Sequence, residues 1–173
     1  RAARAARAAG AQIVMVALHA GTEYQIAPTE QQRSVAAALA ASGEVDLVYG
    51  HHAHVVQPID RIGSTWVVYG LGNFVASQHI RPNLAATSQH EAMVRFTFTE
   101  GGDGRFAVTR AEARPLAMTN VGEPQRVVDL ATLLADPQLT GARRTAYQRM
   151  YDAAVKSLTT LGADGKGLVV AGR

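Results

Sequence analysis

The chain has 173 residues and a mass of 18.3 kDa, which predicts one domain with a single core. Its 47% hydrophobic and 18% charged residues exclude a disordered, collagen-like or coiled-coil protein. The formal net charge of +3 comes mainly from scattered Arg residues with few aromatic neighbours, so we expect no nucleic-acid partner, and the lack of Cys excludes disulfides, thiolate metal sites and Cys nucleophiles.

The first elements are predicted to be a helix and a buried strand. Residues 1–9 contain only Arg and Ala, which favour a helix, and Gly10 stands where a C-terminal cap is expected. Residues 13–18 form a continuous apolar run rich in β-branched side chains, which predicts a strand covered on both faces. This run is far shorter than the ~20 residues of a membrane helix, so we expect this portion to be soluble.

A helix and a second strand complete a βαβ unit. Thr29 and Gln32 have the spacing of a capping box, so a helix is expected from Thr29 to about Ser42, with Gly43 ending it. Residues 45–49 then read as a second buried strand. In a βαβ unit the two strands run parallel.

The rest of the chain is predicted to be antiparallel and then helical. One hairpin joins residues 55–61 and 65–69, and another joins residues 92–99 and 106–116. Between them, residues 70–74 form a tight turn and residues 76–89 a long loop. Helices are expected at residues 127–135 and 140–161, and the last dozen residues are expected to be frayed.

Four of the six histidines follow the two predicted buried strands. His19 comes directly after the first strand, and His51, His52 and His54 come after the second. Ligand sites of α/β sheets open at the carboxyl ends of strands, and neutral imidazole is the commonest ligand for metals such as Zn, Mn, Fe or Ni. On an extended chain His52 and His54 point to the same side, so two rings can share one ion.

Alternatives remain open for these residues and their neighbours. A single His here is more often a solvated loop residue or a satisfied core residue, whereas several His at neighbouring strand ends favour a metal site. Glu23, on the loop after His19, fits an acid/base group, a partner for an imidazole N–H, or an exposed carboxylate. Asn73 fits a place in the site wall, but a role in the local turn is the stronger interpretation.

Three blocks of sequence, in this order and spacing, resemble a known family. They are residues 19–24 (HAGTEY), residues 45–58 (VDLVYGHHAHVVQP) and residues 69–74 (YGLGNF). With Pro28 and the helix start after it, they resemble the bacterial capsule-synthesis CapA family, the poly-γ-glutamate biosynthesis proteins, whose domain is similar to calcineurin-like metallophosphoesterases. The resemblance covers about residues 1–75.

The resemblance implies an α/β fold of the mixed α+β kind, a metallophosphoesterase-like β-sandwich flanked by helices, with a two-metal site at the strand ends. It implies that His19, His52 and His54 bind divalent metal ions, Mn, Fe or Zn. His51 and Glu23 are then the catalytic candidates, which assist proton transfer near the metals.

The chain departs from the family pattern at three positions. Ala20, Ala53 and Gly70 stand where an aromatic residue, Pro and Ser are usual. These smaller side chains are expected to loosen the wall of the pocket without removing a ligand.

The resemblance also predicts how the chain is organised. Residues 1–125 are expected to form the C-terminal half of a CapA/metallophosphoesterase-like domain, and residues 126–173 a C-terminal helical extension. The missing N-terminal half of the same domain is then a necessary partner, because it bears Asp, Asn and His ligands, and the isolated chain is expected to be inactive or to bind metal weakly. The family's usual location implies a cell-envelope protein, extracytoplasmic or membrane-associated, with envelope biosynthesis partners.

Two functions of different classes agree with these features. The first is a metal-dependent hydrolase of phosphoester type in capsule biosynthesis. The second is a non-hydrolytic accessory for synthesis or export of an anionic polymer, or an anionic-ligand-binding domain that keeps the fold.

Overall fold

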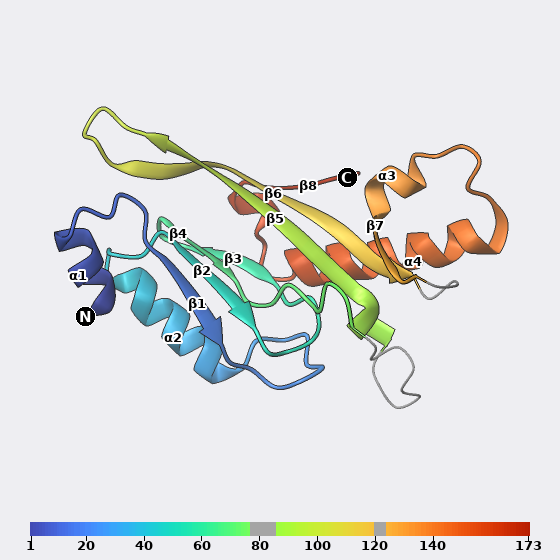
Figure 1. Cartoon of the computed structure of the whole chain (residues 1–173), viewed down its shortest axis with the longest axis horizontal. Helices are drawn as coiled ribbons and strands as arrows, with labels where there is room; N and C mark the ends of the chain where they lie inside the picture. Colours follow the sequence, from blue (N-terminus) through green and yellow to red (C-terminus); the bar gives the residue numbers. More distant parts are fainter. Residues whose placement is uncertain (77–85, 120–123) are drawn as a thin grey trace.

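The computed structural model describes residues 1–76, 86–119 and 124–173 and shows a mixed α/β fold, as expected. Two helices, Ala2–Ala8 (α1) and Glu30–Ala41 (α2), pack on one face of a first sheet, and a second sheet packs on its other face. Figure 1 shows the long hairpin of the second sheet crossing the first. The strands of the first sheet are Met15–His19 (β1), Leu47–His51 (β2), Ile59–Ile62 (β3) and Thr65–Val68 (β4).

The first sheet has the strand order β1-β2-β4-β3 and contains the predicted βαβ unit. Strand β1 runs parallel to β2 in a register that pairs His19 with His51, and β4 is also parallel to β2. The capping box at the start of α2 is confirmed in both directions, because the Thr29 hydroxyl accepts from the Gln32 amide and the Gln32 side chain accepts from the Thr29 amide. The two-residue turn between β3 and β4 is also confirmed, with Gly63 at φ +62°.

The prediction that both faces of the first strand are covered is wrong for β1. Met15 is 52% exposed, and Ala17 and His19 are exposed on the same face, whereas Val16 and Leu18 are half-buried against the helices. The second sheet covers β2, β3 and β4, through contacts with residues such as Leu47, Ile59 and Trp66. Strand β1 lies beyond this contact, at the edge of the first sheet. The prediction holds for β2, whose Leu47 and Val48 are buried.

The second sheet is formed by the antiparallel strands His90–Glu100 (β5), Phe106–Thr119 (β6) and Arg126–Asp129 (β7), and by Leu168–Val170 (β8), which is parallel to β6. The predicted hairpin of residues 92–99 and 106–116 is confirmed and is longer than expected. Residues 77–85, most of the predicted loop, lie outside the described residues, and Ala86–Gln89 form a short 3-10 helix (η2).

The C-terminal residues differ from the prediction in two places. The expected helix at 127–135 begins only at Leu130 (α3, Leu130–Leu134), because residues 126–129 pair with β6 and Asp129 caps the helix. The last dozen residues are not frayed, since a 3-10 turn, Asp164–Lys166 (η3), leads into β8. The predicted long helix is present as Gly141–Thr159 (α4) and packs on the second sheet, so residues 126–173 supply both helices and two strands of that sheet.

Candidate functional site

The loops that follow β1 and β2 lie side by side at one end of the first sheet (Figure 1). Two backbone hydrogen bonds join them: the Ala20 amide donates to the His51 carbonyl at 3.3 Å, and the Tyr24 amide donates to the Ala53 carbonyl at 2.7 Å. The parallel register of β1 and β2 makes these contacts possible, because both strands reach the same edge at the same level.

Three histidines come together between these loops. The ring centroids of His19 and His52 are 4.8 Å apart, and those of His52 and His54 are 6.4 Å apart. Two imidazoles bound to one ion through nitrogen–metal bonds of about 2.0–2.1 Å have centroids roughly 5–6 Å apart, so these spacings are close to those of shared ligands. The ring of His51 is instead edge-on to the ring of Tyr49, with the centroids 5.7 Å apart.

The backbone that presents these rings is not extended. His52 has φ +99° and His54 has φ +57°, so the argument that an extended His-Ala-His segment directs both rings to one side is wrong. Tyr24 at φ +61° and Phe74 at φ +64° are the other non-glycine residues with positive φ among those described, and both flank the same site. Each such conformation costs about 1–3 kcal/mol and persists only where neighbouring structure enforces it.

Asn73 contacts both the ring and the backbone of His54. Its side-chain oxygen lies 2.6 Å from Nδ1 of His54, while its side-chain nitrogen donates to the carbonyls of His54 and Ser88 at 3.2 and 3.3 Å. Because an amide oxygen cannot donate, this contact requires a proton on Nδ1 of His54, and in the neutral imidazole the lone pair is then on Nε2. The interpretation of Asn73 as mainly a turn residue is therefore wrong, since its amide bridges three segments around the site.

A buried pair of glutamines joins the loop after β1 to the segment that follows His54. Gln32 donates to Oε1 of Gln57 at 2.8 Å, and Gln57 donates to the carbonyl of Gln25 at 2.9 Å. Both side chains are almost fully buried, at 1% and 0% exposed. This pair ties α2, the loop after β1 and the segment after His54 into one unit.

Two of the small residues that depart from the family pattern do not loosen the wall. A Cβ at Gly70 would lie 3.0 Å from Oε1 of Gln57 and 3.1 Å from the Val55 carbonyl, so the Gln57 side chain already fills this space. Ala53 is 1% exposed and is packed in place. The expectation of a looser wall is wrong at these positions.

Gly50 and Gly72 allow backbones to approach closely beside the site. A Cβ at Gly50 would lie 2.0 Å from the Tyr69 carbonyl, and a Cβ at Gly72 would lie 2.6 Å from the His90 carbonyl. A glycine at each position is therefore a condition for bringing the His loop and the Asn73 turn against their neighbours.

Glu91 lies next to Gly72, and sequence patterns did not identify it as a buried residue. It is 0% exposed, and within the part of the chain that the structure describes neither carboxylate oxygen has a hydrogen-bond partner. Burial raises its pKa to about 8, an effect that the nearby Met118 backbone offsets only in part. The predicted strand began at residue 92, and no local signal marked residue 91 as buried.

The two predicted proton-transfer residues lie at the rim of the site. Glu23 is exposed, and no hydrogen bond or ion pair joins it to any described residue. His51 is also exposed and is paired with His19 in the strand register. Neither residue is locked in place as His54 is.

The described residues do not form a complete metal site by themselves. Within residues 1–76, 86–119 and 124–173, no three His, Cys, Asp or Glu side chains are arranged to hold a metal ion as they stand. The three imidazoles have a donor type that suits a divalent cation, but no carboxylate of these residues completes a group with them to balance its charge.

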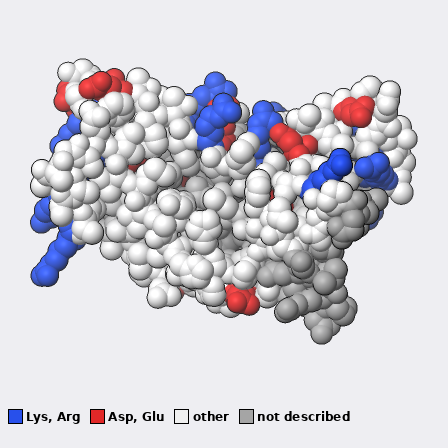
Figure 2. Space-filling view, in the orientation of Figure 1, with Lys and Arg blue, Asp and Glu red and all other residues white. Residues whose placement is uncertain are grey.

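Charged side chains form small groups of both signs elsewhere on the surface. Figure 2 shows these groups separated by wide uncharged areas on the face that is viewed. On the second sheet, Arg110 and Glu112 are 2.8 Å apart and Arg114 pairs with Asp129. Such exposed pairs contribute little to stability, about 0–1 kcal/mol each. No helix in the described part of the chain is long and apolar enough to cross a bilayer.

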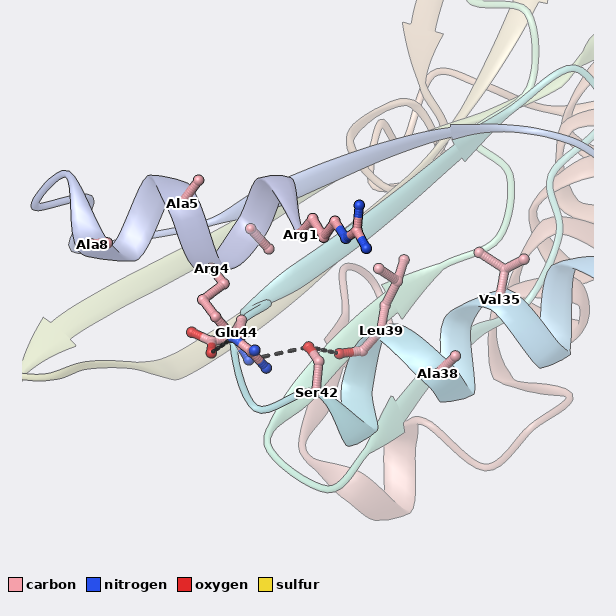
Figure 3. A pocket seen from close by; sticks show the side chains of 10 residues that line it. Arg1, Arg4, Ala5, Ala8, Val35, Ala38, Leu39, Ser42 and Glu44 are labelled. Carbon is pink, nitrogen blue, oxygen red and sulfur yellow. Dashed lines mark hydrogen bonds and ion pairs between the residues drawn. The ribbon is translucent and has the colours of Figure 1, made fainter.

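A surface groove lies between α1 and α2 (Figure 3). It has a volume of about 760 Å³, and its apolar lining comes from Ala side chains of both helices together with Val35 and Leu39. Arg4 and Glu44 form an ion pair at its border, 3.3 Å apart. The lining carries no imidazole, so this groove plays no part in the site described above.

A comparison with known proteins matches the part of the chain that contains the histidines of the site. Residues 1–78, which include these histidines, match the family model described as "Bacterial capsule synthesis protein PGA_cap". Over these residues the chain is similar to this capsule synthesis family. The family resemblance predicted from the three sequence blocks is thereby confirmed.

Two curated relatives extend the match. The chain is 38% identical over 99 residues to "PGA biosynthesis protein CapA" of Bacillus subtilis (strain 168), which covers 57% of this chain and 24% of that protein. It is 40% identical over 68 residues to "Capsule biosynthesis protein CapA" of Bacillus anthracis, which covers 39% of this chain and 16% of that protein. The chain thus spans about a quarter or less of the relatives it matches.

Proposed function

We propose that the chain contributes the imidazole side of a metal-dependent hydrolase site, of phosphoester type, to a capsule biosynthesis protein of the cell envelope. The observation that carries this proposal is the contact of Nδ1 of His54 with the Asn73 oxygen, which in the neutral ring places the lone pair on Nε2, in the residue grouped with His52 and His19. A solvated loop histidine needs no such constraint, whereas a metal ligand almost always donates its other ring N–H to an acceptor.

The proposed site is built from two parts. His19, His52 and His54 would hold part of the coordination of a divalent cation such as Mn, Fe or Zn, and carboxylates from the rest of the full-length protein would complete it. A bound cation of this kind lowers the pKa of a water ligand so that hydroxide is present near neutral pH.

His51 and Glu23 are the proposed proton-transfer residues. Both are exposed at the mouth of the histidine cluster, where a substrate can reach them. His51 is the better placed of the two, because its strand register sets it next to His19. The substrate class that this proposal names is a phosphoester, because a divalent cation held by these histidines would polarise a phosphoryl oxygen.

The test uses the full-length protein, with its metal content and its turnover of an aryl phosphodiester as readouts. The double variant His52→Ala/His54→Ala should lose metal and turnover together, while Gln31→Ala, an exposed change on α2, should keep both. A double variant that retains metal and turnover at the wild-type level contradicts the proposal.

A second function is favoured by the names of the two relatives, which refer to capsule and PGA biosynthesis rather than to hydrolysis. In this alternative the same cluster binds carboxylates of an anionic polymer during its synthesis or export. Polymer binding by a metal-loaded wild type that shows no turnover supports this alternative over the hydrolase.

A further inference from the structure

Tyr24 has an unfavourable backbone conformation that its neighbours enforce. Its φ of +61° lies in the left-handed region, where an aromatic side chain is rare. The hydrogen bond from its amide to the Ala53 carbonyl, at 2.7 Å, anchors the residue to the centre of the His52–His54 segment. This anchor determines where the Tyr24 side chain can go.

The side chain of Tyr24 stacks on the imidazole of His54. The ring centroids are 5.8 Å apart and the ring planes are inclined by 22°. Both residues have positive φ, so two unfavourable backbones are maintained together at this one contact. An offset, nearly parallel arrangement of this kind is favourable for two π systems.

The stacked ring restrains a movement that Asn73 alone leaves free. A hydrogen bond from Nδ1 of His54 to Asn73 fixes one atom of the imidazole but permits the ring to tilt about the Nδ1–Oδ1 line. A second ring lying almost parallel to the imidazole face opposes that tilt. The edge and the face of His54 are therefore held by two different segments of the chain.

His51 provides a natural comparison within the same loop. Its ring meets Tyr49 edge-on, with the planes inclined by 88°, and its side chain is exposed. No hydrogen bond to its imidazole is found among the described residues. A tyrosine neighbour alone does not restrain a histidine in this way.

We propose that Tyr24 is a positioning residue for His54: its stacked ring keeps the imidazole in the plane in which Asn73 accepts from Nδ1, and so maintains the tautomer whose Nε2 is free for a cation. This inference deepens the proposed function and rests on it for the role of Nε2. The restraint itself is a property of the protein without metal, and it is tested separately.

The first experiment measures the tautomer of His54 without metal. Long-range ¹H–¹⁵N spectra of the labelled protein resolve the ring nitrogens, and His54→Gln assigns the signals. We expect one tautomer, with the proton on Nδ1, in the wild type and in Tyr24→Phe. We expect a mixture in Tyr24→Leu and Tyr24→Gly, with the His51 signals unchanged in all variants. Tyr24→Gly removes the ring and also relieves the positive φ, so it stays informative if Tyr24→Leu does not fold.

Two results overturn the inference. One is a wild type whose His54 carries its proton on Nε2, and the other is a folded Tyr24→Gly protein in which His54 keeps the single Nδ1–H tautomer. A Tyr24→Phe protein that behaves like Tyr24→Gly also contradicts it, because phenylalanine retains the stacking surface.

The second experiment separates this inference from the proposed function. Zinc titration of the full-length protein should give a dissociation constant about 10-fold or more higher in Tyr24→Gly, and nearly unchanged in Tyr24→Phe. A wild type that shows the restrained tautomer but no zinc binding refutes the proposed function and leaves the positioning role intact. Zinc binding that depends on His52 and His54 but not on Tyr24 refutes the positioning role alone.

Discussion

The side-chain oxygen of Asn73 accepts a hydrogen bond from Nδ1 of His54 at 2.6 Å, between residues nineteen positions apart in the chain. The same amide group donates to the His54 carbonyl, so Asn73 is hydrogen-bonded to both the ring and the backbone of His54. This double contact joins the turn after β4 to the loop after β2.

Replacing Asn73 tests how much this contact contributes to binding of a cation. Asn73→Ala should weaken zinc binding by the full-length protein about 10- to 100-fold, because the ring of His54 loses its acceptor. Asn73→Asp keeps the acceptor, although it loses the two donor contacts, and should retain most of the affinity. Calorimetry would measure both values, and equal loss in the two variants would contradict the assigned role of the oxygen.

The buried Gln32–Gln57 pair predicts a coupled effect on stability. Gln32→Leu and Gln57→Leu should each lower the free energy of unfolding by about 1–3 kcal/mol, because each leaves the other amide buried and unpaired. The double variant should lose less than the sum of the two single losses. Urea unfolding of the three variants checks this, and strict additivity would exclude the coupling.

The close approach of Gly50 to the Tyr69 carbonyl predicts a large effect from one methyl group. Gly50→Ala should lower the free energy of unfolding by about 3 kcal/mol or more, since its Cβ would lie 2.0 Å from a backbone oxygen that cannot move independently. Gly102→Ala is the matched control, because nothing lies within 4 Å of a Cβ there. Thermal unfolding that shows equal shifts for the two variants would rule out this packing argument.

The raised pKa of Glu91 predicts that the free energy of unfolding falls as the pH rises. Its pKa is about 8 in the folded protein against an ordinary value of 4.5, so folding favours the protonated form, and this favourable effect is lost between those values. From pH 6.5 to 8 the loss amounts to about 2 kcal/mol. Burial also lowers the pKa of neighbouring His90 from its ordinary value of 6.5. The effect of His90 on stability has the opposite sign, because below pH 6.5 the unfolded protein binds the proton more readily and stability rises with pH.

Glu91→Gln should abolish most of this fall, because the amide does not ionise. Glu100→Gln, an exposed change at the end of β5, should leave it intact. Urea unfolding at pH 6.5 and pH 8 compares the three proteins. A wild-type stability that does not fall between these pH values would show that Glu91 ionises normally.

Much of the site could be predicted because its signals are local in the sequence. The capping box of Thr29 and Gln32 and the apolar run of residues 45–49 fixed the βαβ unit, and that unit brought His19 next to the second histidine group. The positions of His52 and His54 followed from this topology. Their positive φ values did not, because backbone strain of this kind depends on tertiary contacts such as the one between Tyr24 and Ala53.

The errors arose where distant segments decide the structure. Residues 126–129 are apolar enough for a helix but pair with β6, and the Gly-rich C-terminus becomes strand β8 because β6 offers it a parallel partner. The exposure of Met15 likewise follows from how far the second sheet reaches, which the composition of β1 does not encode. The role of Asn73 was misjudged and Glu91 was not identified for the same reason, since their environments depend on residues far along the chain.

The position of β1 has a consequence for handling the protein in solution. Within the described residues this strand pairs with β2 alone, so its other edge has backbone amides and carbonyls without a strand partner. The side chain of Met15, which is 52% exposed, belongs to the same strand. An edge strand of this kind can pair with a strand of another molecule. The recovery of monomer after refolding should therefore decrease as the protein concentration rises.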